Sequence, residues 1–280
     1  MSMTKFSLLP VAASFALALT ASTAIAQTAP AAAAPASPHT FTANIALVSD
    51  YRFRGMSQTW KRPALQGGID YSHSSGFYLG NWNSMVARNQ YYGGAGLEMD
   101  FYGGWKGEIA KDVTLDVGGL LYYYPGANYG KAAGVPSGRF TNFEPYVGLS
   151  YKWFSAKYFI STTNWFGLGA QQDNALFGVN RGTTGSQYLD ITGTFDVVDK
   201  VQIIAHAGFQ SVRGNSNLNN TDLKLGVTYD WNSIILGATA YVNDPKNRAA
   251  WDTTQNINPF GGSVRNVSKG ALVLSVTKNF

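Results

Sequence analysis

The carboxyl-terminal stretch Ala271-Leu272-Val273-Leu274-Ser275-Val276-Thr277-Lys278-Asn279-Phe280 decides the fold. Leu272, Leu274 and Val276 alternate with residues of a second, more polar face, and this period of two predicts a β-strand. A strand of about ten residues is long enough to cross an outer membrane once. Lys278 departs from the apolar face, but a lysine near a membrane boundary can extend its ammonium group to water. We therefore expect Phe280 to end the closing strand of an outer-membrane barrel.

The amino-terminal end agrees with export. Lys5 precedes an apolar stretch over residues 6–19, and Ala24-Ile25-Ala26 has the small-x-small pattern of a cleavage site. We predict a signal peptide over residues 1–26, since the stretch is shorter than the ~20 residues of a membrane-spanning helix, the alternative interpretation. Residues 27–40, rich in Ala and Pro, are predicted to be a disordered periplasmic lead-in, and residues 41–280 the barrel.

Composition narrows the class of protein. The chain has 21 Lys and Arg against 16 Asp and Glu, a formal net charge of +5, and no cysteine. The absence of cysteine excludes a disulfide framework and a thiolate metal site. An aromatic content of 14% and 31 glycines suit many short strands joined by turns, in one closed β domain.

The alternation recurs along the chain and predicts twelve strands. They are expected near residues 42–52, 64–73, 76–85, 96–107, 112–124, 143–153, 154–163, 187–197, 200–210, 221–231, 233–243 and 270–280. The connections between them are alternately short and long. A soluble sandwich would show the same period but has no need of this asymmetry. The pattern predicts an all-β fold, a transmembrane antiparallel up-and-down barrel of about twelve strands with short periplasmic turns and long extracellular loops.

Aromatic residues cluster at both ends of the predicted strands. Tyr71, Phe77, Tyr151, Trp153, Phe154 and Trp231 lie beside the short turns, and Tyr51, Trp82, Tyr91, Tyr122 to Tyr124, Trp165 and Tyr241 lie at the opposite ends. We expect the two sets to form interfacial girdles in the membrane, rather than ordinary core aromatics.

The strand register sorts the charged residues onto the inner face. The expected pore-lining residues are Asp50, Arg52, Asp70, Glu98, Asp100, Asp116, Glu144, Lys157, Asp190, His206, Asp222 and Lys224. Their acidic excess predicts a bias toward cations or zwitterions. The alternative is that acids and bases pair across a narrow interior and close it. Asp50 and Arg52 could form a salt bridge that holds the first loop at the barrel mouth, or could recognise a solute.

The long loops carry the opposite charge. Eleven basic residues stand there against the acidic Asp173, Asp244 and Asp252: Arg54, Lys61, Arg62, Arg88, Lys131, Arg139, Arg181, Arg213, Lys246, Arg248 and Arg265. We interpret them first as binding groups for lipopolysaccharide phosphates and second as groups that attract anionic solutes. Export argues against nucleic acid as a partner.

Candidate catalytic residues are few. His39, His73 and His206 are the only histidines, and none has the spacing of a metal site. His73 and Ser75 superficially resemble the pair of an outer-membrane phospholipase, and Glu98 with Asp100 could in principle be an acid–base pair, but a solvated lumen wall explains the acids without chemistry. We expect no enzyme activity, no cofactor and no metal.

Several sequence blocks carry a family resemblance. Ser49-Asp50-Tyr51-Arg52-Phe53-Arg54-Gly55-Met56-Ser57-Gln58-Thr59 is the most specific, and residues 63–68, 75–80, 98–104, 124–126 and 155–158 add weaker matches in order. Together they resemble the TorF porin family. The resemblance implies an outer-membrane barrel with a transport role, and it supplies no catalytic residues.

Two functions follow as hypotheses. The first is passive diffusion of small hydrophilic solutes through a narrow pore in the outer membrane. The second is a sealed structural or adhesive barrel whose basic loops bind lipopolysaccharide or a surface partner. A chain of twelve strands with no apolar surface patch beyond its lipid-facing belt is expected to be a monomer.

Overall fold

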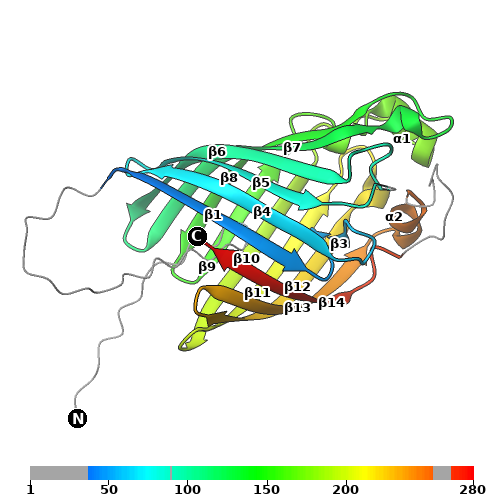
Figure 1. The fold of residues 1–280 in the computed structure, drawn as a ribbon. Helices are drawn as coiled ribbons and strands as arrows, with labels where there is room; N and C mark the ends of the chain where they lie inside the picture. The colour runs from blue at the N-terminus through cyan, green and yellow to red at the C-terminus, as the bar shows by residue number, and fades with distance from the viewer. Residues whose placement is uncertain (1–36, 89, 255–265) are drawn as a thin grey trace, which may run out of the picture.

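The computed structural model describes residues 37–88, 90–254 and 266–280, and twelve of the strands among them close into one barrel (Figure 1). Each of these strands pairs antiparallel with its neighbours, which confirms the predicted fold class. The barrel strands are β1 (His39–Val48), β4 (Ala64–His73), β5 (Phe77–Met85), β6 (Leu97–Ala110), β7 (Val113–Asn128), β8 (Arg139–Tyr151), β9 (Phe154–Ile160), β10 (Gln187–Val198), β11 (Val201–Ser211), β12 (Asn220–Trp231), β13 (Ile234–Pro245) and β14 (Ala271–Asn279).

The first and last strands close the barrel, as the terminal alternation predicts. β14 pairs with β1 in a register that sets Asn279 opposite Asn44. The backbone N–H of Phe280 donates to the carbonyl of Ala43 at 2.9 Å. Closure matters because it leaves no strand edge with unpaired backbone groups.

The boundaries of β1 differ from the expectation. The strand begins at His39, so the predicted lead-in over 27–40 ends two residues too late, and it stops at Val48 instead of continuing to residue 52. The backbone N–H of Ser49 still bonds the carbonyl of Leu274, but the chain then turns into the barrel. The alternation that continues through residue 52 belongs to a separate hairpin.

The barrel wall has an apolar outer face and a polar inner face. Leu225 and Leu272, 60% and 66% exposed, point outward, while their strand neighbours Lys224 and Val273 point inward. Outward leucines, valines and aromatics recur around the whole barrel. In water such a continuous apolar belt would be a large exposed hydrophobic surface, whereas in lipid it is the expected surface of a spanning barrel.

Short and long connections alternate as predicted. The short turns lie at one end of the barrel, here called the turn end, where β1 also begins and β14 ends (Figure 1). The long connections lie at the other end, the loop end. β7 and β8 continue as a paired ribbon to Asn128 and Arg139, so the loop expected over 125–142 is shorter than predicted.

Most of the loop-end half of the predicted aromatic girdle is wrong. At the turn end, Phe77, Tyr151, Trp153 and Trp231 are exposed on the outer surface, as expected. At the loop end Tyr123 is exposed on the outer face, as expected, but Tyr51, Tyr91, Tyr122, Tyr124 and Trp165 are buried in one cluster beneath the loops. Trp82 packs against Tyr51, and Tyr241 lies beneath the Arg52 guanidinium, 5.8 Å away. Tyr122 and Tyr124 lie on the inner face of β7, whereas the long loops carry Tyr51, Tyr91 and Trp165 into the same buried cluster.

Some expectations fall outside the described residues. They are the signal peptide over 1–26, most of the lead-in and Arg265. Within the part of the chain that the structure describes, no helix is both long and apolar enough to cross a membrane.

The two-faced wall gives a first prediction. In a lipid bilayer, Leu225→Arg should lower the free energy of unfolding by about 2 to 4 kcal/mol, because the charge would face hydrocarbon near the middle of β12. Thr228→Arg is the matched control, since Thr228 lies on the inner face of the same strand. Urea unfolding of the reconstituted protein measures both. Equal losses for the two variants would contradict the assignment of faces.

Candidate functional site: the inserted hairpin and the loop-end chamber

A small hairpin from the first long loop enters the barrel. Its strands β2 (Arg52–Phe53) and β3 (Met56–Ser57) are joined by Arg54 and Gly55, with φ of 45° and 78°. Positive φ at both central residues is the mark of a tight two-residue hairpin turn. A Cβ atom on Gly55 would lie 2.0 Å from Asn243 Oδ1 and 2.7 Å from Asp222 Cβ. Only glycine therefore fits where the hairpin tip meets β12 and β13.

An internal ion pair fixes this inserted hairpin. Arg52 Nε donates to Asp50 Oδ2 at 2.9 Å, which is the salt bridge that the sequence predicts. Arg52 Nη1 also donates to the carbonyls of Gly55 and Lys269, both at 2.9 Å. Asp50 Oδ1 accepts from the hydroxyl of Ser57 at 2.6 Å. Asp50 and Arg52 thus belong to the first loop and not to the wall, and the Arg52 side chain is too buried to meet a solute.

Arg54 at the hairpin tip reaches the opposite wall. Its guanidinium donates to Glu144 on β8 and Gln210 on β11, each at 2.5 Å. It also lies over the ring of Tyr188, 4.1 Å from the centroid. The amide of Asn220 donates to the Arg54 carbonyl at 3.0 Å. One side chain therefore bridges three wall strands across the lumen, which sequence reasoning did not foresee because Arg54 counted as an exposed loop base.

Three predicted pore-lining carboxylates lie deep beside this hairpin. Glu98, Asp100 and Glu144 are 0%, 2% and 1% exposed. The Tyr51 hydroxyl donates to Glu98 Oε1 at 2.6 Å, and Asn142 and Ser161 donate to Glu144 Oε1. The expectation that a solvated wall surrounds Glu98 and Asp100 is wrong, because both carboxylates are buried and Tyr51 of the first loop bonds Glu98.

Nearer the turn end, the inward carboxylates bond tyrosines and a lysine. Tyr102 donates to Asp70 at 2.5 Å, and Tyr78 donates to Asp116 at 2.6 Å. Lys157 Nζ forms an ion pair with Asp116 at 2.7 Å. These contacts join strands that are not sequence neighbours, so the polar interior is a connected network.

His206 is the centre of the second half of that network. Its Nε2 lies 3.0 Å from Asp222 Oδ1, and its Nδ1 lies 3.4 Å from Asp190 Oδ1. The Tyr188 hydroxyl donates to Asp222 at 3.0 Å, and Lys224 is opposite His206 in the register of β11 and β12. The structure places all four predicted residues of this group on the inner face.

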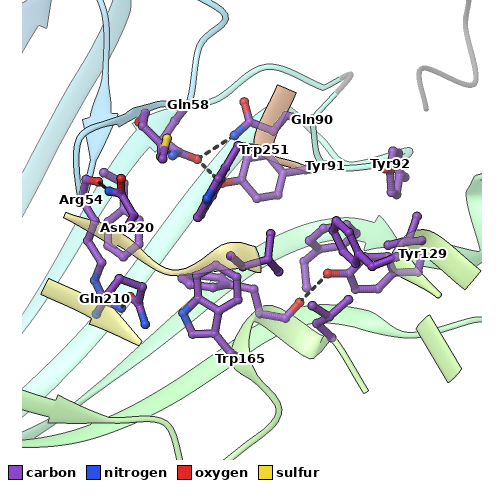
Figure 2. Close-up of a pocket in the computed structure, with 18 residues that line it drawn as sticks. Arg54, Gln58, Gln90, Tyr91, Tyr92, Tyr129, Trp165, Gln210, Asn220 and Trp251 are labelled. Atoms are coloured by element: carbon purple, nitrogen blue, oxygen red, sulfur yellow. Dashed lines mark hydrogen bonds between the residues drawn. The ribbon is translucent and has the colours of Figure 1, made fainter. Parts of the chain in front are cut away.

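A cavity of about 130 Å³ lies above the inserted hairpin, at the loop end (Figure 2). We call it the loop-end chamber. Arg54, Gln58, Gln90, Gln210 and Asn220 supply its polar groups. Aromatic rings from five of the six long loops and their flanking strands form most of the remaining wall: Phe53, Tyr91, Tyr92, Tyr129, Phe140, Trp165, Phe166, Phe177 and Trp251.

Two short helices hold the chamber wall. α1 (Ala170–Phe177) contributes Phe177, and α2 (Arg248–Thr254) contributes Trp251, whose ring meets Trp165 edge to face at 6.0 Å. Gln172 of α1 donates to the Ser137 carbonyl at 2.8 Å. α1 is therefore tied to the loop between β7 and β8.

Asp173 ties the same helix to the loop between β11 and β12. Its Oδ1 accepts from Asn215 Nδ2 at 2.6 Å, and its side chain is buried. Burial raises the pKa of Asp173 to about 6, although the bond from Asn215 opposes the shift. The carboxylate is therefore charged at neutral pH in a place that favours its neutral form.

Sequence reasoning did not find the chamber. The aromatic pairs Tyr91-Tyr92 and Trp165-Phe166 stand inside predicted loops, where exposed rings are unfavourable. The density of aromatic residues in the loops is the sequence feature that could have indicated a buried cluster. This pattern alone, however, does not distinguish a buried cluster from a membrane girdle.

The candidate catalytic pairs stay apart from this site. His73 Nδ1 and Ser75 Oγ are 2.6 Å apart at the exposed turn end. Over the described ranges, no carboxylate or amide side chain bonds His73, and no group of three or more His, Asp or Glu residues could hold a metal ion. Glu98 and Asp100 are both buried in the barrel interior.

This protein is a closed twelve-stranded barrel with a polar interior and an inserted first loop. Solved porins have similar structures. The NanC porin matches with a TM-score of 0.50 at 10% identity, over 85% of this chain and 98% of that one. The KdgM porin matches with a TM-score of 0.49 at 8% identity, over 85% and 98% of the two chains. At these identities the likeness shows the fold alone.

The family is shown by sequence. Residues 32–280 match the family model described as "Bacterial protein of unknown function (Gcw_chp)", so the chain belongs to that family. No curated protein matches.

Asp173 gives a prediction for the loop end. Its pKa of about 6 lies above the ordinary value of about 4, so the folded loop binds the proton more tightly than the unfolded loop. The stability of the wild-type loop should therefore fall as the pH rises from 4 to 6 and then level off. Thermal unfolding followed by tryptophan fluorescence should show a smaller fall for Asp173→Asn.

A second aspartate provides the control. Asp244 is exposed on β13, so Asp244→Asn should leave the wild-type pH dependence intact. An unchanged pH dependence in Asp173→Asn would contradict the assignment of this group.

Proposed function

We propose that this protein is a monomeric outer-membrane channel for the passive diffusion of small hydrophilic solutes. The observation that carries the proposal is the division of the wall into an apolar outer belt and a connected polar interior in one closed chain. A barrel of this kind is stable only where lipid covers the outside and polar groups or water fill the inside. The resemblance to the TorF porin family agrees with this proposal.

The inserted hairpin makes the proposed channel narrow. Arg54 extends from the hairpin tip to Glu144 on β8 and Gln210 on β11, and thus divides the lumen at the height of the loop-end chamber. Solutes would pass beside this bridge or when the hairpin moves.

The charges support a bias toward cations or zwitterions. Seven of the predicted pore-lining carboxylates face inward, and they outnumber Lys106, Lys157 and Lys224 on the same wall: Asp70, Glu98, Asp100, Asp116, Glu144, Asp190 and Asp222. Arg54 reduces the excess only at the constriction. Charged groups that line a pore set its ionic preference.

A second candidate function has its own observation. Eight of the predicted loop bases are exposed at the loop end: Arg62, Arg88, Lys131, Arg139, Arg181, Arg213, Lys246 and Arg248. They could bind lipopolysaccharide phosphates, which would anchor either an open channel or a sealed barrel. If the Arg54 bridge closes the lumen permanently, surface binding becomes the main function.

Gly55 provides the test of the channel. Gly55→Ala should displace the hairpin tip, because the new Cβ would meet Asn243 and Asp222, and single-channel conductance in planar bilayers should rise severalfold. Gly134→Ala is the matched control: Gly134 has a similar φ of 75° but no atom within 4 Å of the added Cβ. It should conduct like the wild type.

Sealed bilayers for the wild type and for Gly55→Ala would overturn the channel proposal. A sealed wild type with a conducting Gly55→Ala variant would instead support the sealed barrel, with the hairpin as its plug.

The charge bias gives a separate prediction. Reversal potentials in unequal KCl should show cation preference, and Asp190→Asn should reduce it, since the Asp190 side chain is the most accessible carboxylate of the His206 group, at 32% exposure. Asp244→Asn removes a carboxylate from the outer surface and should not change the potential. Anion preference in the wild type would contradict the bias.

A further inference from the structure

The loop-end chamber combines aromatic faces with unsatisfied polar atoms. Trp165 Nε1, a donor, and Asn220 Oδ1, an acceptor, are buried and have no hydrogen-bond partner within the described residues. Both residues line the chamber, and Figure 2 shows the indole nitrogen of Trp165 on the side nearest Gln210. A buried polar atom without a partner costs free energy, so a ligand that supplies the missing partners would bind favourably.

The charge of the chamber selects against ions. Among the described residues that line it, the one charged side chain is Arg54, whose guanidinium is already paired with Glu144 at 2.5 Å. A cation would meet this guanidinium without a free carboxylate to stabilise it. An anion would have to displace Glu144 and leave that carboxylate buried and unpaired. The chamber therefore suits a neutral ligand.

The size of the chamber limits the ligand further. Its volume of about 130 Å³ holds roughly ten water-sized groups, at about 10 to 15 Å³ for each. A compact ring molecule with about ten to twelve non-hydrogen atoms matches this volume.

We propose that the loop-end chamber is a binding site for a neutral monosaccharide. A pyranose ring has apolar C–H faces that can pack on the chamber's aromatic rings, and hydroxyls that both donate and accept hydrogen bonds. One hydroxyl accepts from Trp165 Nε1 and another donates to Asn220 Oδ1. This site names a class of solute for the proposed channel. Its role in transport rests on the proposed function, whereas sugar binding itself does not.

Binding is measured by isothermal titration calorimetry of the full chain in detergent. The sugars are D-glucose, D-galactose, D-mannose and D-xylose. At least one of these sugars should bind, and D-glucuronate and choline should bind at least tenfold more weakly. Trp165→Phe keeps an aromatic face and removes the N–H, so it should weaken sugar binding about threefold to tenfold. Trp153→Phe, at the exposed turn end, is the matched control and should bind like the wild type.

The proposal is overturned if none of the four sugars binds, if choline or D-glucuronate binds as tightly, or if Trp165→Phe binds sugar like the wild type. Bilayer recordings test the channel separately from sugar binding. Conduction without sugar binding rejects the sugar site alone, whereas sugar binding to a protein that seals the bilayer rejects the channel alone.

Discussion

The guanidinium of Arg54 carries a positive charge into the interior of the barrel, and Glu144 is the carboxylate that neutralises it. Removing one partner of such a buried pair leaves an uncompensated charge, at a cost of about 3 to 5 kcal/mol. The position of the hairpin therefore depends on this pair. Because the hairpin residues Phe53, Arg54 and Met56 line the chamber, the geometry of the chamber depends on this pair as well.

The barrel places three environments along one axis. At the loop end, aromatic rings enclose a neutral chamber, and at the constriction Arg54 bridges three wall strands. Toward the turn end, Asp70, Asp116 and Asp190 bond tyrosine, lysine, threonine or histidine side chains. A solute entering from the loops would thus meet aromatic surface first, then a paired ion bridge, and then an acidic wall. In the proposed channel, this order would favour neutral or cationic polar solutes over anions.

Local pattern predicts the wall because a strand's two faces follow directly from its alternation. Leu272, Leu274 and Val276 are expected on the outer face from sequence and are outward in the structure. The inserted hairpin could not be found in this way, since Asp50 and Arg52 continue the same alternation after β1 has ended at Val48. Its position is set by contacts of Gly55 and Arg54 with residues 90 to 188 positions away, such as Glu144 and Asn243. For the same reason Tyr91 and Trp165 are predicted on a membrane girdle and instead pack inside.

Single-channel conductance shows whether the ion pair of Arg54 and Glu144 holds the hairpin in the lumen. Arg54→Met, Glu144→Gln and the double variant are recorded beside the wild type in planar bilayers. If the pair holds the hairpin in the lumen, each single variant releases it, and the double variant conducts no more than either single one. If the conductance increase of the double variant equals the sum of the two single increases, the pair does not hold the hairpin in the lumen. The same follows if the single variants conduct like the wild type.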